Sequence, residues 1–204
     1  TFYSMFGFQR VGDLIWQAAD ARARGFLMGA TAGRTTLMGE GLQHQDGHSL
    51  LLASTIPACQ AYDPAFAYEV AALIRHGLTR MYGDNPADIF YYITLYNENI
   101  LMPPQPKHVA DADIVNGLYR WSDASTEEVH ASILFSGTAF KAASEASAIL
   151  RDKYNINTDL WSATSYKSLR DDAMEVERWN RLHPTEAPRE SLVQSILGSA
   201  STPL

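Results

Sequence analysis

The uncharged stretch Ile89–Tyr96 (IFYYITLY) constrains the fold of this chain more than any other part of the sequence. Its residues are aliphatic, aromatic or β-branched, so a strand formed here would have no polar face. A strand of this kind must be covered on both sides, which is typical of a parallel sheet that carries helices on both faces. The stretch therefore predicts an α/β fold.

Helical and strand patterns alternate on either side of this stretch. Gly12–Arg24 has apolar residues at helical spacing, and Gly25 ends that pattern. Asp63-Pro64 predicts the start of a helix that ends at Gly83, because Asp can accept from free helix N–H groups and Pro has no N–H to lose. The remaining predicted elements are the strands Phe26–Ala30, Ala58–Tyr62, Val129–Ser136 and Thr158–Ala163, and the helices Ser49–Ser54, Ala139–Lys153, Ser165–Asn180 (capped by Ser165 or Ser168) and Glu190–Leu197. This alternation indicates mainly parallel sheets.

A proline-rich segment, Met102–Pro106 (MPPQP), divides the pattern into two halves. Prolines stiffen a chain and remove backbone donors, so the segment is typical of a linker. We expect two partial three-layer α/β domains over residues 1–101 and 111–204, with residues 102–110 between them. A chain of 204 residues that is 46% hydrophobic can bury enough surface for this arrangement.

Composition argues against several classes of partner. The net charge is −7 and Lys and Arg form no block, which disfavours nucleic acid. No apolar run approaches the ~20 residues of a membrane span, and no signal-peptide pattern begins the chain. The single cysteine, Cys59, excludes an internal disulfide and suits a reducing compartment, so a cytoplasmic location is expected. The chain begins without Met on an aromatic segment, and we expect it to be part of a longer protein.

The stretch Thr31–Ser49 (TAGRTTLMGEGLQHQDGHS) has no apolar periodicity and concentrates glycines with ionisable groups. Glycines allow a backbone to approach a ligand closely, and histidine beside carboxylates can transfer protons near neutral pH. His44, with Glu40 four residues before it, is the main candidate for such chemistry. His48 is either a further catalytic candidate or a cap of the helix that follows. An irregular polar surface loop is the alternative for the whole stretch.

Five segments of the sequence resemble a known family in the same order and spacing. They are YSMFGFQRVGDLIWQAAD, GATAGRTTLMGEGLQHQDGHS, YDPAFAYEVA, YYITLYNEN and ERWNRLHP. Together they resemble the homodimeric bacterial E1 component of the pyruvate dehydrogenase complex, a thiamine-diphosphate enzyme of transketolase-like architecture. The resemblance covers most of the chain. It places the chain at the end of the pyrimidine-binding domain and the beginning of the C-terminal domain of that family.

The resemblance implies roles for four residues. Phe6 matches the ring that stacks on the aminopyrimidine of the cofactor, and Tyr3 matches the residue near its exocyclic amine. His44 matches the histidine that points toward the reacting carbons, and Glu40 accompanies it as a catalytic candidate. An aromatic face can hold a flat heterocycle and a phenol adds a polar group, although core packing is the alternative for this aromatic pair. The resemblance assigns no role to Arg10, Asp46 or His48.

The resemblance also implies what this chain lacks. In the family, a glutamate upstream of the YSMF segment activates the cofactor, and a GDG…N motif in another domain holds the diphosphate and Mg²⁺. Neither is present here, so no metal ligand is expected in this chain, and it should supply half of a site. The implied partners are a second copy of the chain, the lipoyl-bearing E2 acetyltransferase and pyruvate.

Three other functions remain open from the sequence. The chain could belong to the E1 component of another 2-oxo acid dehydrogenase or to another thiamine-diphosphate enzyme. It could be a metal-dependent hydrolase with His44, Asp46 and His48 as ligands, although a third strong ligand is not apparent. It could also be a non-catalytic assembly fragment.

Overall fold

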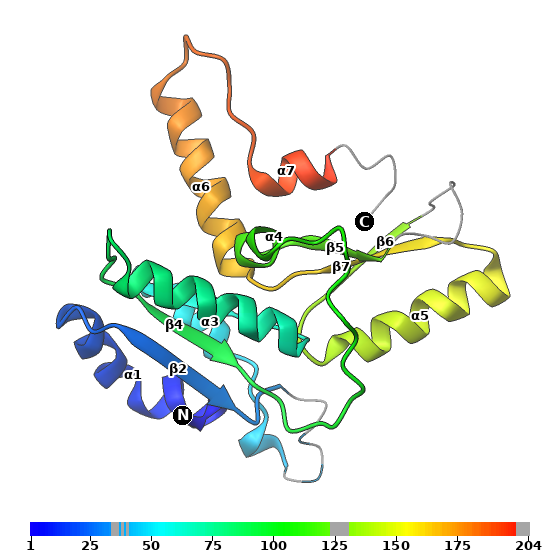
Figure 1. Cartoon of the computed structure of the whole chain (residues 1–204), viewed down its shortest axis with the longest axis horizontal. Helices are drawn as coiled ribbons and strands as arrows, with labels where there is room; N and C mark the ends of the chain where they lie inside the picture. The colour runs from blue at the N-terminus through cyan, green and yellow to red at the C-terminus, as the bar shows by residue number, and fades with distance from the viewer. Residues whose placement is uncertain (34–36, 38, 40, 123–130, 199–204) are drawn as a thin grey trace.

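The computed structural model describes residues 1–33, 37, 39, 41–122 and 131–198. These residues form two sheets with helices around them (Figure 1). The strands are β1 (Phe2–Tyr3), β2 (Gly25–Ala30), β3 (Cys59–Tyr62), β4 (Phe90–Thr94), β5 (Tyr119–Ser122), β6 (Ala131–Phe135) and β7 (Thr158–Ser162). The helices are α1 (Ser4–Asp20), α2 (Ser49–Ser54), α3 (Ala67–Tyr82), α4 (Asp111–Asn116), α5 (Ala139–Tyr154), α6 (Tyr166–Leu182) and α7 (Leu192–Leu197), with a 3₁₀ turn η2 at Leu42–His44.

The first sheet has the strand order β1-β2-β4-β3, and all of its pairs are parallel. Every residue of β4 is buried, as the uncharged stretch predicts. Phe90 and Tyr92 face a core formed with α1 and α2, whereas Tyr91 and Ile93 face a core formed with α3. This is the three-layer arrangement expected for a strand without a polar face.

The second sheet has the order β5-β7-β6, in which β6 is parallel and β5 antiparallel to β7. Phe135 and Leu160 pack toward α5, while Trp161 packs with Leu169 of α6 and with α7. The α/β class with mainly parallel sheets is confirmed. The sequence pattern does not predict α4 or β5, because both are short and β5 carries Arg120.

The first helix begins earlier than predicted. α1 starts at Ser4 rather than Gly12, with non-helical backbone angles at Val11. Gly7 and Gly12 weaken the helical signal in sequence, since glycine is a poor helix former. The structure explains Gly7, because a Cβ there would lie 1.8 Å from the Phe2 ring.

The predicted capping role of Asp63 is wrong. α3 begins at Ala67, and the free N–H groups of Ala65 and Phe66 donate to Oε2 of Glu69 at 2.6 and 3.0 Å. The Asp63 carboxylate turns instead to the end of β4, where it accepts from the hydroxyls of Thr94 (2.6 Å) and Tyr96. Glu69 therefore supplies the acceptor that Asp63 was expected to supply.

The two sheets are joined by a set of buried polar contacts. Oε1 of Glu69 accepts from Tyr119 on β5 at 2.5 Å and from Ser162 on β7 at 2.7 Å. The Ser165 hydroxyl donates to the Ala61 carbonyl at 2.6 Å. These bonds connect α3 and β3 of the first half to the second half of the chain.

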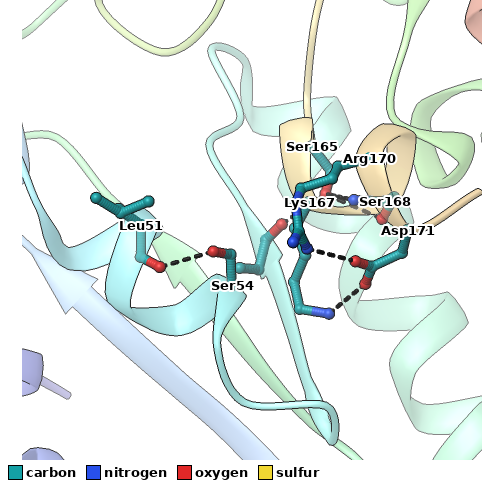
Figure 2. Close-up of polar contacts among 8 residues, drawn as sticks. Leu51, Ser54, Ser165, Lys167, Ser168, Arg170 and Asp171 are labelled. Carbon is teal, nitrogen blue, oxygen red and sulfur yellow. Dashed lines mark hydrogen bonds and ion pairs between the residues drawn. The ribbon is translucent and has the colours of Figure 1, made fainter. Parts of the chain in front are cut away.

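The start of α6 confirms Ser165 as its cap. Figure 2 shows the Ser165 hydroxyl accepting from the Ser168 N–H, at 3.0 Å, and Lys167 bonded to Asp171. The end of α2 lies opposite, where Ser54 donates to the Leu51 carbonyl at 2.7 Å. None of the described helices is long and apolar enough to cross a membrane.

Candidate active site

Three of the four residues that the resemblance selects come together at one end of the first sheet. Tyr3 ends β1, Phe6 lies in the first turns of α1, and His44 is the last residue of η2. The ring centroids of Tyr3 and Phe6 are 5.2 Å apart, and the His44 ring lies 5.7 Å from Tyr3 and 5.6 Å from Phe6. All three are partly buried. Glu40, the fourth candidate, lies outside the described residues.

Parallel pairing places this group at a position suited to ligands. Tyr3 is in register with Ala30, the last residue of β2, so it lies at the carboxyl edge of the sheet. Ligands of open α/β sheets bind beyond the carboxyl ends of the strands. The loop then returns to this edge, where Gly41, at φ +87°, precedes the turn that carries His44.

Arg10 lies over the Phe6 ring, with its guanidinium carbon 4.1 Å from the ring centroid. A guanidinium in this position attracts the negative face of an aromatic ring by about 0.5–1 kcal/mol when exposed. Phe6 thus contacts Arg10, Tyr3 and His44, and none of the four is among the core clusters formed by the described residues. Cofactor stacking by Tyr3 and Phe6 stays a prediction beside the core-packing alternative.

The capping role considered for His48 belongs to Asp46. His48 occupies the N-cap position of α2 but its side chain makes no capping bond. Oδ1 of Asp46 instead accepts from the N–H groups of His48 at 3.2 Å and Ser49 at 3.0 Å. Aspartate side chains often accept from backbone N–H groups two or three residues later in a turn. This signal in the sequence could have identified Asp46 in place of His48.

The three side chains considered as hydrolase ligands do not converge. Within the described ranges, which include His44, Asp46 and His48, no group of three or more His, Cys, Asp or Glu side chains could hold a metal ion. Because Asp46 is engaged with backbone N–H groups, the metal-dependent hydrolase has no support from the described part of this loop.

A family model described as the pyruvate dehydrogenase E1 component middle domain matches residues 1–103. The chain belongs to this family. It is 52% identical over its whole length to the pyruvate dehydrogenase E1 component of Pseudomonas aeruginosa and 50% identical to that of Mycobacterium tuberculosis. The chain spans 23% and 22% of the length of these two relatives.

Solved transketolases share the fold of this segment of the E1 family. A transketolase from Campylobacter jejuni aligns with 87% of this chain at a TM-score of 0.66 and 18% identity, over 26% of its own length. A split-gene transketolase, described as an inactive tetramer, aligns with 99% of this chain at a TM-score of 0.62 and 17% identity, over 64% of its own length. The resemblance to the E1 family and the transketolase-like fold are both confirmed.

Proposed function

We propose that this chain is a segment of an E1 component that decarboxylates pyruvate oxidatively and passes the acetyl unit to a lipoyl group on E2. The observation that carries the proposal is the meeting of Tyr3, Phe6 and His44 at the carboxyl edge of a parallel sheet, in a chain of the E1 family. On this proposal, residues 1–101 end the pyrimidine-binding domain and residues 111–204 begin the C-terminal domain.

The donor set of the site fits one half of thiamine diphosphate. Phe6 offers a ring for stacking, and Tyr3 offers a phenol beside it, which suits a flat heterocycle that carries an amine. On this proposal, and as the resemblance implies, the diphosphate and Mg²⁺ would be held by parts of the protein outside this chain. When bound, thiamine diphosphate supplies the nucleophilic carbon and the electron sink for loss of CO₂.

His44 would act on the substrate oxygen. A 2-oxo acid gains negative charge on its carbonyl oxygen during addition, and an imidazole can stabilise that charge and donate a proton. The rings of Tyr3 and Phe6 lie beside the imidazole. Glu40, in the same loop, is the second catalytic candidate.

The remaining partners follow from the same proposal. A second copy of the chain, a lipoyl-bearing E2 and pyruvate are proposed as partners, with a cytoplasmic location for the complex. The E1 component of another 2-oxo acid dehydrogenase is the alternative, because the described residues other than His44 do not indicate the size of the substrate pocket.

The test is His44→Ala in a full-length E1 component that contains this segment. Turnover of pyruvate should fall about 100-fold, within the usual range for general acid–base help, while cofactor affinity and melting temperature stay close to wild type. His108→Ala is the control, because His108 is an exposed histidine remote from the site in sequence whose ring bonds the Arg120 carbonyl. Near wild-type turnover in His44→Ala would refute the proposed role.

A further inference from the structure

Ser4 is the point at which the aromatic segment meets the loop of His44. It follows Tyr3 and precedes Phe6, and it is 0% exposed. Its hydroxyl donates to Oδ2 of Asp46, two residues after His44. Its carbonyl accepts from the Ser49 hydroxyl at 3.0 Å. Both the side chain and the main chain of Ser4 are therefore bonded to the loop.

The direction of the hydrogen bonds follows from the chemistry of the groups. A carboxylate only accepts, so the single proton of the Ser4 hydroxyl is used by Asp46. The Tyr92 hydroxyl, 3.0 Å from Ser4 Oγ, must then donate to Ser4. Burial raises the pKa of Tyr92, and the nearby negative charge of Asp46 raises it further. The phenol therefore keeps its proton and remains a donor.

Tyr92 is a rigid anchor for this chain of bonds. It is 0% exposed, its ring stacks on Phe2 at 6.0 Å, and Phe8 meets it edge-on at 4.7 Å. The ring crosses β2 at Gly29, where a Cβ would lie 2.7 Å from the hydroxyl. Tyr92 therefore has a fixed position in the sheet, and the hydrogen bonds through Ser4 connect Asp46 to it.

We propose that Asp46 is a positioning residue that holds His44 at its distance from the rings of Tyr3 and Phe6. This inference rests on the proposed function of His44. Oδ1 of Asp46 fixes the start of α2 and Oδ2 fixes the start of α1, so one carboxylate sets the loop against both helices. Asp46 acts through His44 and not on the substrate itself.

The test uses a full-length E1 component that contains this segment, with kcat measured at saturating thiamine diphosphate, Mg²⁺ and pyruvate and the cofactor KM measured by titrating thiamine diphosphate. Asp46→Ala should lower kcat about 10- to 100-fold, the range expected when a reacting group is displaced by about 1 Å, with little change in the KM for the cofactor. Ser4→Ala should lower kcat in the same direction but less, because Asp46 keeps its backbone contacts. The double variant His44→Ala/Asp46→Ala should be no slower than His44→Ala alone.

A matched control separates positioning from stability. Asp113 accepts from the Ala110 N–H at 2.8 Å at the start of α4, so Asp113→Ala removes a comparable carboxylate cap away from the site. It should lower the melting temperature and keep kcat.

Provided that His44→Ala is impaired, three outcomes would overturn the inference. The first is a wild-type kcat in Asp46→Ala. The second, if that variant does not fold, is a wild-type kcat in Ser4→Ala. The third is a double variant His44→Ala/Asp46→Ala whose kcat falls by the product of the two single effects. Wild-type turnover in His44→Ala would instead reject the proposed function, and the positioning role with it.

Discussion

Removing the buried carboxylate of Glu69, which joins the two halves of this chain, should lower the free energy of unfolding. Glu69 is 0% exposed and accepts four hydrogen bonds: two from the N–H groups of Ala65 and Phe66, and two from the hydroxyls of Tyr119 and Ser162. In Glu69→Ala the hydroxyls can find other partners, and that of Tyr119 already lies 2.7 Å from the Tyr68 hydroxyl. The two N–H groups have no such freedom. At about 1–3 kcal/mol for each orphaned donor, the loss in free energy of unfolding is about 2–6 kcal/mol.

Glu69→Gln is the matched variant that tests this reasoning. Its amide oxygen can keep both N–H donors, while its NH₂ group can donate to the hydroxyls of Tyr119 and Ser162, which can also accept. The expected loss is about 0.5–1.5 kcal/mol, the size of one ordinary hydrogen bond. Urea denaturation of the 204-residue chain, followed by the fluorescence of its four tryptophans, measures both. Equal losses in the two variants would refute the account.

Glu69 also predicts a pH dependence with a definite sign. Burial, the larger cause, raises the pKa of its carboxyl from the ordinary 4.5, although four hydrogen bonds oppose the shift. The folded state therefore retains its proton over a range in which the unfolded state has lost it. The stabilisation that arises from this pKa difference is fully present below pH 4.5 and is lost as pH rises through the folded pKa. Glu69→Gln should flatten the stability profile in that window, and an unchanged profile would contradict the assignment.

Three further predictions concern single sites. Gly7→Ala should destabilise the chain by about 1–3 kcal/mol in the same denaturation assay, because the new Cβ would overlap Phe2. A Cβ at Gly12 would have no atom within 4 Å, so Gly12→Ala should stabilise the chain by about 0.5–1 kcal/mol. Phe6→Ala in a full-length E1 component should raise the cofactor concentration for half-maximal rate more than it lowers kcat, since stacking acts in ground and transition states alike; a rate that stays low at saturating cofactor would contradict this. Cys59 is fully buried and burial raises its pKa to about 12, so a thiol reagent at pH 8 should label it only after denaturation, as followed by mass spectrometry.

The sequence predicts the elements whose signals are local. The helix Ser49–Ser54 has the predicted bounds, and the uncharged stretch around β4 is a fully buried strand. Asp63-Pro64 shows the limit of such signals. The helix that this pair predicts begins later, at Ala67, where Glu69 satisfies its N–H groups, while Asp63 bonds Thr94, 31 residues away. Tertiary partners decide which of two carboxylates becomes the cap.

The candidate site divides in the same way. Residue chemistry and family resemblance select Tyr3, Phe6 and His44, and the structure brings their rings within 6 Å of one another. Neither signal selects Ser4, because a serine between Tyr3 and Met5 has no distinctive local pattern. Its partners lie 42 and 88 residues away in sequence, and only the parallel pairing of the strands brings them to it.

The junction between the two sheets combines apolar packing with buried polar groups. Phe66 of the first half packs with Phe135 of the second sheet, and such apolar attraction has little directional preference. The Glu69 carboxylate accepts from Tyr119 and Ser162 at the same junction, and these hydrogen bonds require defined directions. Each buried donor left unpaired costs about 1–3 kcal/mol. The polar groups at the start of α3 therefore add a preferred orientation to the apolar contact, and a change at Glu69 should disturb the relative placement of the two halves before it disturbs either core.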